Sequence, residues 1–264
     1  MARKIVFTSG KGGVGKTTVC ANIGIKLASM GLRVVMLDLD IGLNNLDVVM
    51  GIENKIVFDI VDCLENKCRV KQALVQDYKY PNLYVLPSSH LFSSNSVNAH
   101  AIKLIVDALA VSFDYVLIDC PAGIDIGFHR AVFCADEAFV VTTPHISSIR
   151  DADKVISVLK SYNLVSIKLI VNRIRGDLVL NGEMVDADRI AKLLKVDLIG
   201  VVQDEDTLGS QIAGKILRQN NLKNPTSIDI LGMNIHNGTN YIFDYMSKYR
   251  GLFGNIKRSL RRKL

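Results

Sequence analysis

The most constraining feature of this sequence is a glycine-rich segment at residues 10–18, which reads Gly-Lys-Gly-Gly-Val-Gly-Lys-Thr-Thr. It follows an apolar run at residues 4–8 and leads directly into a helical pattern that starts at Lys16. Glycines let consecutive backbone N–H groups face one concavity, and a helix N-terminus adds positive charge there, so the segment predicts a phosphate-binding loop. In such a loop the lysine reaches the β and γ phosphates, and the hydroxyl after it binds Mg²⁺. The predicted ligand-binding residues of the loop are Gly12, Gly13, Val14, Gly15, Lys16, Thr17 and Thr18.

Short apolar runs alternate with helical patterns along the rest of the chain. The expected strands are residues 4–8, 33–38, 83–86, 115–119, 138–142, 168–171 and 198–202, and the expected helices are residues 16–30, 98–111, 148–162 and 186–194. This alternation predicts an α/β fold with a mostly parallel sheet flanked by helices. With the glycine-rich loop after its first strand, the chain resembles the P-loop NTPase type. Hydrophobic residues make up 49% of the 264, enough for one large core. Residues 218–240 have no assigned element.

Acidic residues follow two of the expected strands. Asp38 ends the run at 33–38 and Asp40 lies two residues later, and Asp119 ends the run at 115–119. If the strand at 33–38 continues as far as Asp40, the alternation of its side chains places Asp38 and Asp40 on one side of it, next to the phosphate loop. The alternative is a pair of turn carboxylates at a strand end. Four apolar residues followed by an acid are typical of the carboxylate that helps to hold Mg²⁺ in these proteins, so Asp119 is a predicted metal ligand together with Thr17.

An additional lysine, Lys11, distinguishes this phosphate loop. With it, the loop resembles the deviant Walker A family of ATPases, which includes MinD, ParA, Mrp and the arsenite-pump ATPases. The resemblance implies ATP and Mg²⁺ as cofactors and a homodimer in which Lys11 reaches the partner's nucleotide. It also implies that Asp40 positions the attacking water with support from Asp38, so the expected catalytic residues are Lys11, Lys16, Asp38 and Asp40. The alternative for Lys11 is a solvated loop lysine.

The choice of base depends on the residues after two later strands. Asn172 and Arg173 directly follow the run at 168–171, and Arg175 stands where a guanine-selective site would need an acid, which favours ATP over GTP. The family resemblance implies that Asn172 faces the adenine and that Arg173, Gln203 and Asp204 are further nucleotide contacts. The proline that often precedes such an acid in the family is absent before Asp204. The alternative for Asn172 is a turn residue at a strand end.

Two segments, residues 38–50 and 141–154, resemble the septum-site-determining MinD branch of the family most closely. That branch regulates where the division site is placed, so the resemblance implies a MinE-like activator and a MinC-like inhibitor as partners. Arg150, Asp151 and Asp153 are the expected partner-binding residues, on the first turn of a helix; the alternative is a solvated turn. A flagellar-number regulator and a ParA-like, nucleoid-binding partition ATPase are the rival interpretations. Cys63 and Cys68 have no second cysteine pair, which disfavours an iron–sulfur carrier.

The last twenty residues differ from the rest in charge. They contain seven of the basic residues and no acid, so the net charge of +6 belongs to the tail and the first 244 residues are close to neutral. On a helical wheel, Tyr249 and the apolar residues Leu252, Phe253, Ile256, Leu260 and Leu264 share one side. We therefore expect an ATPase domain at 1–244 and a basic amphipathic helix at 245–264 that binds anionic inner-membrane lipid. A core-packed helix and a tail that binds DNA phosphates without reading bases are the alternatives.

The expected location follows from the same features. The apolar run at the start is too short for a signal peptide, and no apolar stretch is long enough to span a membrane. The five cysteines are an odd number in a chain too long to need disulfides, so reduced thiols are expected. We expect a cytoplasmic protein that is peripheral on the cytoplasmic face of the inner membrane when ATP is bound, and no sequence-specific nucleic acid as a partner.

Overall fold

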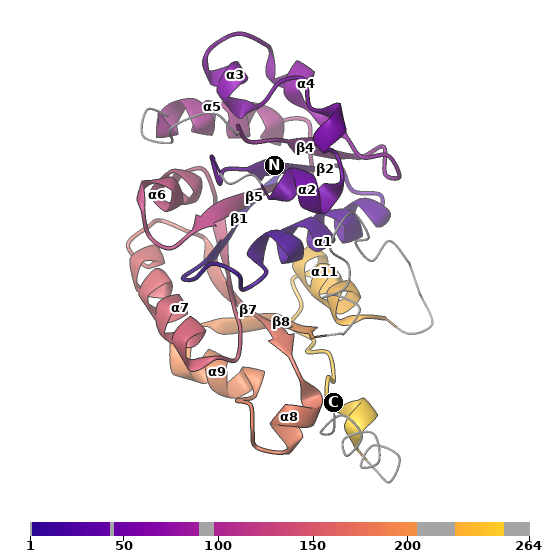
Figure 1. Ribbon diagram of the computed structural model, residues 1–264, viewed down its shortest axis with the longest axis vertical. Helices are drawn as coiled ribbons and strands as arrows, with labels where there is room; N and C mark the ends of the chain where they lie inside the picture. Colours follow the sequence, from indigo (N-terminus) through magenta and orange to yellow (C-terminus); the bar gives the residue numbers. More distant parts are fainter. Residues whose placement is uncertain (1, 43–44, 90–97, 205–224, 251–264) are drawn as a thin grey trace.

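The computed structural model describes residues 2–42, 45–89, 98–204 and 225–250, which form one eight-stranded sheet in the order β3-β4-β2-β5-β1-β6-β7-β8 (Figure 1). The strands are β1 (Arg3–Ser9), β2 (Val34–Asp38), β3 (Val75–Gln76), β4 (Leu83–Leu86), β5 (Tyr115–Ala122), β6 (Glu137–Thr142), β7 (Ser166–Ile174) and β8 (Asp197–Gln203). Neighbouring strands are parallel except β3 and β4, which are antiparallel. The predicted α/β class with a mostly parallel sheet is confirmed.

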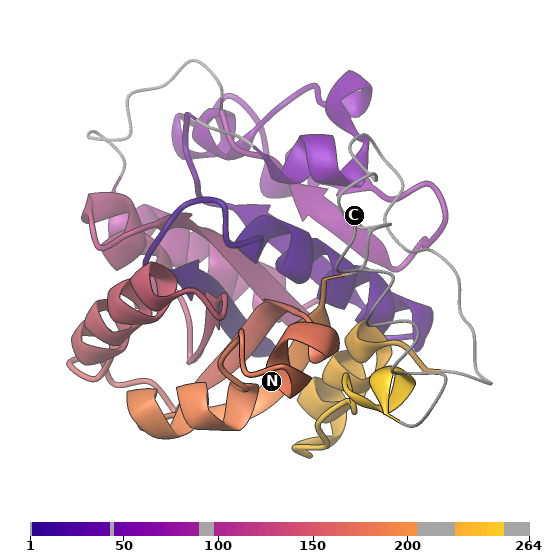
Figure 2. The ribbon, with the colours of Figure 1, turned by 60° about the horizontal axis from the view of Figure 1, so that its bottom comes forward.

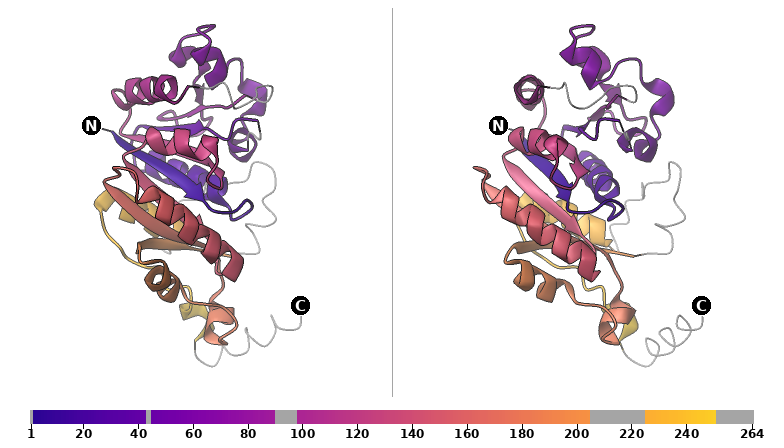
Figure 3. Two further views of the ribbon diagram at one scale, coloured as in Figure 1. Left: turned by 90° about the vertical axis from the view of Figure 1, so that its left-hand side faces the viewer. Right: turned by 60° about the vertical axis from the view of Figure 1, so that its left-hand side comes forward.

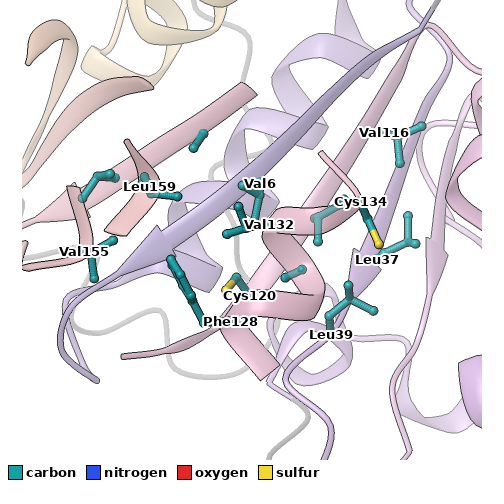
Figure 4. Close-up of a cluster of buried hydrophobic side chains, with 14 of the residues drawn as sticks. Val6, Leu37, Leu39, Val116, Cys120, Phe128, Val132, Cys134, Val155 and Leu159 are labelled. Atoms are coloured by element: carbon teal, nitrogen blue, oxygen red, sulfur yellow. The ribbon is translucent and has the colours of Figure 1, made fainter. Parts of the chain in front are cut away.

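Helices cover both faces of this sheet (Figures 1 and 3). The first core cluster lies between the sheet and α3, α5, α6, α7 and α9, and the second lies between the sheet and α1, α2 and α11. The α-helices are α1 (Lys16–Ser29), α2 (Leu46–Met50), α3 (Ile60–Leu64), α4 (Val70–Ala73), α5 (Ala99–Ala110), α6 (Ile126–Phe133), α7 (Ile146–Leu159), α8 (Gly176–Leu180), α9 (Ala187–Leu194) and α11 (Ser227–Asn237). Two 3₁₀ turns are η1 (Glu53–Lys55) and η3 (Ser247–Tyr249). Figure 4 shows part of the first cluster, in which Phe128 and Val132 of α6 pack near Val6 of β1.

One helix lies inside the stretch that the sequence left unassigned. Helix α11 begins at Ser227 behind a capping box, in which Thr226 and Asp229 bond each other's backbone N–H groups. Asp229 also pairs with Lys26 of α1 at 2.8 Å, and Gly232 lies against the Lys26 stem. A side chain on Gly232 would collide with that stem, so this glycine allows α11 to pack closely on α1.

The chain near its C-terminus packs on α8 (Figure 3). Tyr245 and Tyr249 are buried, and a Cβ added to Gly176 would lie 2.0 Å from the carbonyl oxygen of Tyr245. That carbonyl also accepts a hydrogen bond of 3.2 Å from the side chain of Gln203. The domain boundary that we predicted at residue 245 therefore falls inside a packed segment, and Tyr249 belongs to the body.

The predicted membrane residues Leu252, Phe253, Ile256, Leu260 and Leu264 lie outside the described part of the chain. Within that part, no helix has the length and apolar character needed to cross a bilayer.

Candidate nucleotide site

The phosphate loop joins β1 to α1 at the carboxyl end of the sheet. Gly13 and Gly15 have φ angles of 79° and 88°, in the left-handed region that side chains disfavour, and α1 begins at Lys16. The Lys16 Nζ lies 2.6 Å from Asp119 Oδ1 and 3.3 Å from Thr17 Oγ1. Burial lowers the pKa of Lys16, but the charge and hydrogen bond of Asp119 outweigh this and raise the pKa above its usual value. The loop therefore holds a protonated ammonium at the start of α1.

Asn172 supports the phosphate loop from β7. Its Nδ2 donates to the carbonyl oxygen of Val14 at 2.7 Å, and its Oδ1 accepts from the backbone N–H of Arg173 at 2.9 Å. A Cβ added to Gly15 would lie 2.4 Å from the same Nδ2, so Gly15 leaves the space that Asn172 occupies. We expected the Asn172 side chain to face the adenine. The structure instead directs its amide nitrogen to the loop backbone, while the residue still lines the neighbouring cavity.

Asp38 and Asp119 are opposite each other in the parallel pair β2–β5. β2 ends at Asp38, so the alternation of strand side chains does not extend to Asp40 as we expected. Asp38 instead accepts hydrogen bonds from the backbone N–H groups of Asp40 at 2.9 Å and Leu46 at 3.1 Å. Burial, followed by repulsion from Asp119, raises the pKa of Asp38 to about 7. Asp38 therefore fixes the backbone that carries Asp40.

Asp40 lines a small cavity between the segments that follow β2 and β5. The cavity has a volume of about 170 Å³, and its charged lining groups are Asp40, Asp125 and Arg130. Burial raises the pKa of Asp40, and the nearby ammonium of Lys16 opposes this rise. Asp40 is thus a partly exposed carboxylate near the phosphate loop, whereas Asp38 and Asp119 are buried.

The oxygen atoms beside Lys16 fit a divalent cation. Asp119 Oδ2 is buried and has no hydrogen-bond partner among the described residues. Its other oxygen and the Thr17 hydroxyl both lie within hydrogen-bond range of one ammonium. Mg²⁺ prefers oxygen ligands and is usually held by one or two protein groups plus substrate phosphates, so Thr17 and Asp119 fit its donor requirements.

A larger cavity of about 460 Å³ adjoins the phosphate loop. Its walls combine apolar and polar groups, as expected for a ligand pocket. They are formed by Gly15, Thr18, Val19, Asn22, His145, Asn172, Arg173, Arg175, Leu178, Met184, Val202, Asp204 and Ile228. Arg173 lies at an irregularity in the β7–β8 pairing with a φ of 56°, a conformation that costs about 1–3 kcal/mol for a residue with a side chain.

The side chain of Gln203, which we expected in this cavity, is buried elsewhere. Gln203 is the last residue of β8, and its Nε2 donates to the backbone oxygen of Tyr245 at 3.2 Å. His145, Arg175 and Met184 were not predicted. His145 follows the end of β6, so the tendency of ligands to bind beyond the carboxyl ends of strands could have identified it. Arg175 is held by Asp177 at 2.6 Å and Met184 lies after α8, and nothing local in the sequence indicates either.

The first turns of α7 lie beside the phosphate loop (Figure 2). The Lys11 Nζ donates to Ser147 Oγ at 3.4 Å, and a Cβ added to Gly10 would lie 2.2 Å from the backbone oxygen of Asp151. α7 begins at Ile146, two residues before the start at 148 that we expected. Asp151 and Asp153 therefore lie in its second turn and not in its first.

The three predicted partner-binding residues differ in their contacts. Asp151 pairs with Lys154 at 3.1 Å. Arg150 and Asp153 are exposed.

Comparison with known proteins identifies the family. A family model described as an AAA domain matches residues 2–169. The septum site-determining protein MinD of Bacillus subtilis is 47% identical over 231 residues, which cover 87% of this chain and 83% of the relative. This chain belongs to the MinD family.

Solved MinD structures share the fold. A chain of the MinC:MinD cell division protein complex of Aquifex aeolicus is 39% identical, with a TM-score of 0.80 and coverage of 89% of this chain and 96% of that chain. MinD of Pyrococcus horikoshii, solved in complex with Mg-ADP, is 27% identical, with a TM-score of 0.77 and the same two coverages. The P-loop NTPase architecture of the MinD family is therefore the architecture of this chain.

Proposed function

We propose that this protein is a MinD-type ATPase that regulates the placement of the division site. It hydrolyses ATP to ADP and phosphate, dimerises when ATP is bound, and binds the cytoplasmic face of the inner membrane reversibly. The observation that carries the proposal is the ammonium of Lys16, held between Asp119 and Thr17 at the start of α1, in a chain 47% identical to a MinD protein. The Mg-ADP bound to the relative from Pyrococcus horikoshii supports the choice of ligand.

The residues of the phosphate loop would bind and orient ATP. Backbone N–H groups of the loop and the N-terminus of α1 would surround the phosphates, and Lys16 would exchange Asp119 for phosphate oxygens. Mg²⁺, when held by Thr17 and Asp119, would neutralise part of the phosphate charge. Asp40 would position the attacking water, because it is partly exposed near the charge of Lys16 and Asp38 holds its backbone. Phosphoryl transfer needs mainly such positioning and charge stabilisation.

The adenine would occupy the cavity of about 460 Å³, between Asn172 and Asp204. Arg173 and Arg175 both line this cavity. A guanine-selective site would need an acid at position 175 to accept hydrogen bonds from the base, and this chain has Arg175 there. We therefore expect ATP to bind more tightly than GTP. Competition between the two nucleotides for a fluorescent ATP analogue measures this preference directly.

Lys11 would act in the ATP dimer. Its side chain is exposed, and the ammonium makes one long contact with Ser147, so it is available to a second subunit. Lys11→Ala should keep ATP binding by the monomer but lose the ATP dimer and most hydrolysis. Lys168→Ala is the matched control, because Lys168 pairs with Asp197 away from the loop. An ATP dimer of Lys11→Ala that persists in sedimentation velocity contradicts this role.

The basic tail would bind anionic lipid. One tail should bind weakly, because Gly251 and Gly254 make the free segment a poor helix. Two tails on one ATP dimer gain avidity, so ATP would recruit the protein and hydrolysis would release it. Phe253→Glu should abolish ATP-dependent sedimentation with anionic liposomes, whereas Asn255→Glu, on the other side of the predicted wheel, should not.

The same experiment with duplex DNA added tests the alternative function, a ParA-like partition ATPase that binds the nucleoid. If the intact chain, with ATP, binds duplex DNA and does not bind the liposomes, the membrane proposal is wrong and a partition-type ATPase is favoured.

The α7 surface would bind the partners. A MinC-like inhibitor is supported by the MinC:MinD complex of Aquifex aeolicus, and a MinE-like activator by the family. Charge reversal at Asp151 or Asp153 should weaken stimulation of hydrolysis by such an activator and leave basal hydrolysis unchanged. The control is Asp188→Lys, an exposed acid on α9. Full stimulation of both α7 variants would show that Asp151 and Asp153 do not bind the activator, and would favour the alternative that they form a solvated turn.

A further inference from the structure

Two cysteine thiols meet at the turn between α3 and α4. Cys63 Sγ and Cys68 Sγ are 3.5 Å apart. The turn has the hydrogen bonds of a Schellman motif: Asn66 N donates to Cys63 O at 3.1 Å and Lys67 N donates to Asp62 O at 2.9 Å. Asn66 has the left-handed φ of 59° that this motif requires. The motif reverses the chain after α3 and so returns Cys68 to the side chain of Cys63.

The five cysteines of the chain differ in access to solvent. Cys68 is partly exposed, whereas the other four are buried. Figure 4 shows Cys120 and Cys134 enclosed by the first core cluster. Burial raises the pKa of the Cys120 thiol and of the Cys134 thiol to about 12, so both stay protonated. Thiolates are the reactive form and oxidation is selective for accessible sulfur, so Cys68 is the thiol that a dissolved oxidant reaches.

We propose that Cys68 and Cys63 are a reversible oxidation site for peroxides. In the first step the Cys68 thiolate attacks one oxygen of hydrogen peroxide, the O–O bond breaks, and a sulfenic acid and hydroxide form. In the second step the Cys63 sulfur attacks the sulfenic sulfur, and the hydroxyl group leaves with the Cys63 proton as water. The two sulfur atoms together lose two electrons, which reduce the peroxide. A dithiol reductant restores both thiols by exchange.

The two steps should differ in rate. Burial raises the pKa of the Cys63 thiol to about 12, and the hydrogen bond with Cys68 adds to this. A thiol that rarely ionises attacks slowly, so the sulfenic acid on Cys68 should persist before the disulfide closes. This order predicts that a sulfenic-acid trap such as dimedone, added with the peroxide, labels Cys68 and diverts the protein from the disulfide.

Peptide mapping of the intact protein tests the proposal. The folded chain is treated with hydrogen peroxide, its remaining thiols are alkylated, and it is digested with trypsin. Trypsin cleaves after Lys67 and Arg69, so a disulfide would hold the dipeptide Cys68-Arg69 to the peptide 56–67. We expect this linked pair, its loss after dithiothreitol, and unmodified Cys20, Cys120 and Cys134. Absence of the linked pair, or equal oxidation of the buried thiols, overturns the proposal.

Two variants with a matched control identify the roles of the sulfurs. Cys68→Ser should abolish both dimedone labelling and the linked pair. Cys63→Ser should keep the label on Cys68 and accumulate it, because no thiol resolves the sulfenic acid. Cys134→Ser should oxidise like the wild type. If Cys63→Ser loses the label, Cys68 is not the attacking thiol. If a serine variant fails to fold, the tryptic peptide map of the oxidised wild-type protein still tests the proposal.

Discussion

Gly10 holds the phosphate loop against α7, and its substitution gives a test of the site's architecture that does not involve ligand. A Cβ added to Gly10 would lie 2.2 Å from the backbone oxygen of Asp151 and 2.3 Å from its carbonyl carbon. Real Cβ atoms essentially never approach another atom within 3.0 Å. These two nearest atoms belong to the backbone of α7, so Gly10→Ala must displace either the loop or the second turn of α7.

The size of the effect follows from this overpacking. Forcing a methyl group into a filled space costs about 1–3 kcal/mol, which lowers the melting temperature of a chain of this size by roughly 2–12 °C. Gly12→Ala is the matched control, because a Cβ there would meet nothing within 4 Å among the described residues and Gly12 is outside the left-handed region. That change removes backbone freedom from the unfolded chain, so it should stabilise the protein by about 0.4–1 kcal/mol or leave it unchanged.

The assay is thermal unfolding followed by circular dichroism, without nucleotide, for the wild type and both variants. We expect Gly10→Ala to melt below the wild type and Gly12→Ala to melt at or above it. Equal melting temperatures for the two variants would refute the reasoning, because they would show that the loop and α7 do not press on each other at Gly10.

Three further predictions concern the charged groups of the site. Lys16→Ala should weaken ATP binding by about 10–100-fold in calorimetry, since a buried charge-assisted contact is worth about 1.5–3 kcal/mol, and undiminished affinity would remove Lys16 from the site. Asp40→Ala should retain ATP and slow phosphate release; hydrolysis at the wild-type rate would show that Asp40 does not position the water. Asp38 has a pKa raised from 3.8 to about 7, so its contribution to the free energy of unfolding is greatest below pH 4 and is lost as the pH rises through 7. The stability of Asp38→Asn should therefore decline less than that of the wild type over this range in urea titrations, and parallel pH profiles would contradict the raised pKa.

Local patterns in the sequence predicted the sheet and the phosphate loop. Glycine spacing and apolar runs act over a few residues, and the structure places β1, the loop and α1 where these patterns indicate. α11 was missed because its capping box and its apolar residues lie inside a longer stretch that is polar and asparagine-rich.

Contacts between distant segments explain the remaining differences. Asn172 bonds to Val14, which is 158 residues away, and Gln203 bonds to Tyr245, which is 42 residues away. The irregular pairing at Arg173 decides which side chains of β7 reach the cavity, and no local pattern encodes it. Position within the motif thus predicted that Lys16 and Asp119 lie close together, but not the hydrogen-bond partners of Asn172 and Gln203.

The packing of residues 245–249 on α8 joins the end of the described chain to the candidate nucleotide site. Tyr245 and Tyr249 are buried in that contact, so the segment and α8 are held together by packing. Helix α8 also carries Leu178, a wall residue of the larger cavity. A displacement of residues 245–249 would therefore move α8 and with it one wall of the cavity proposed to hold adenine.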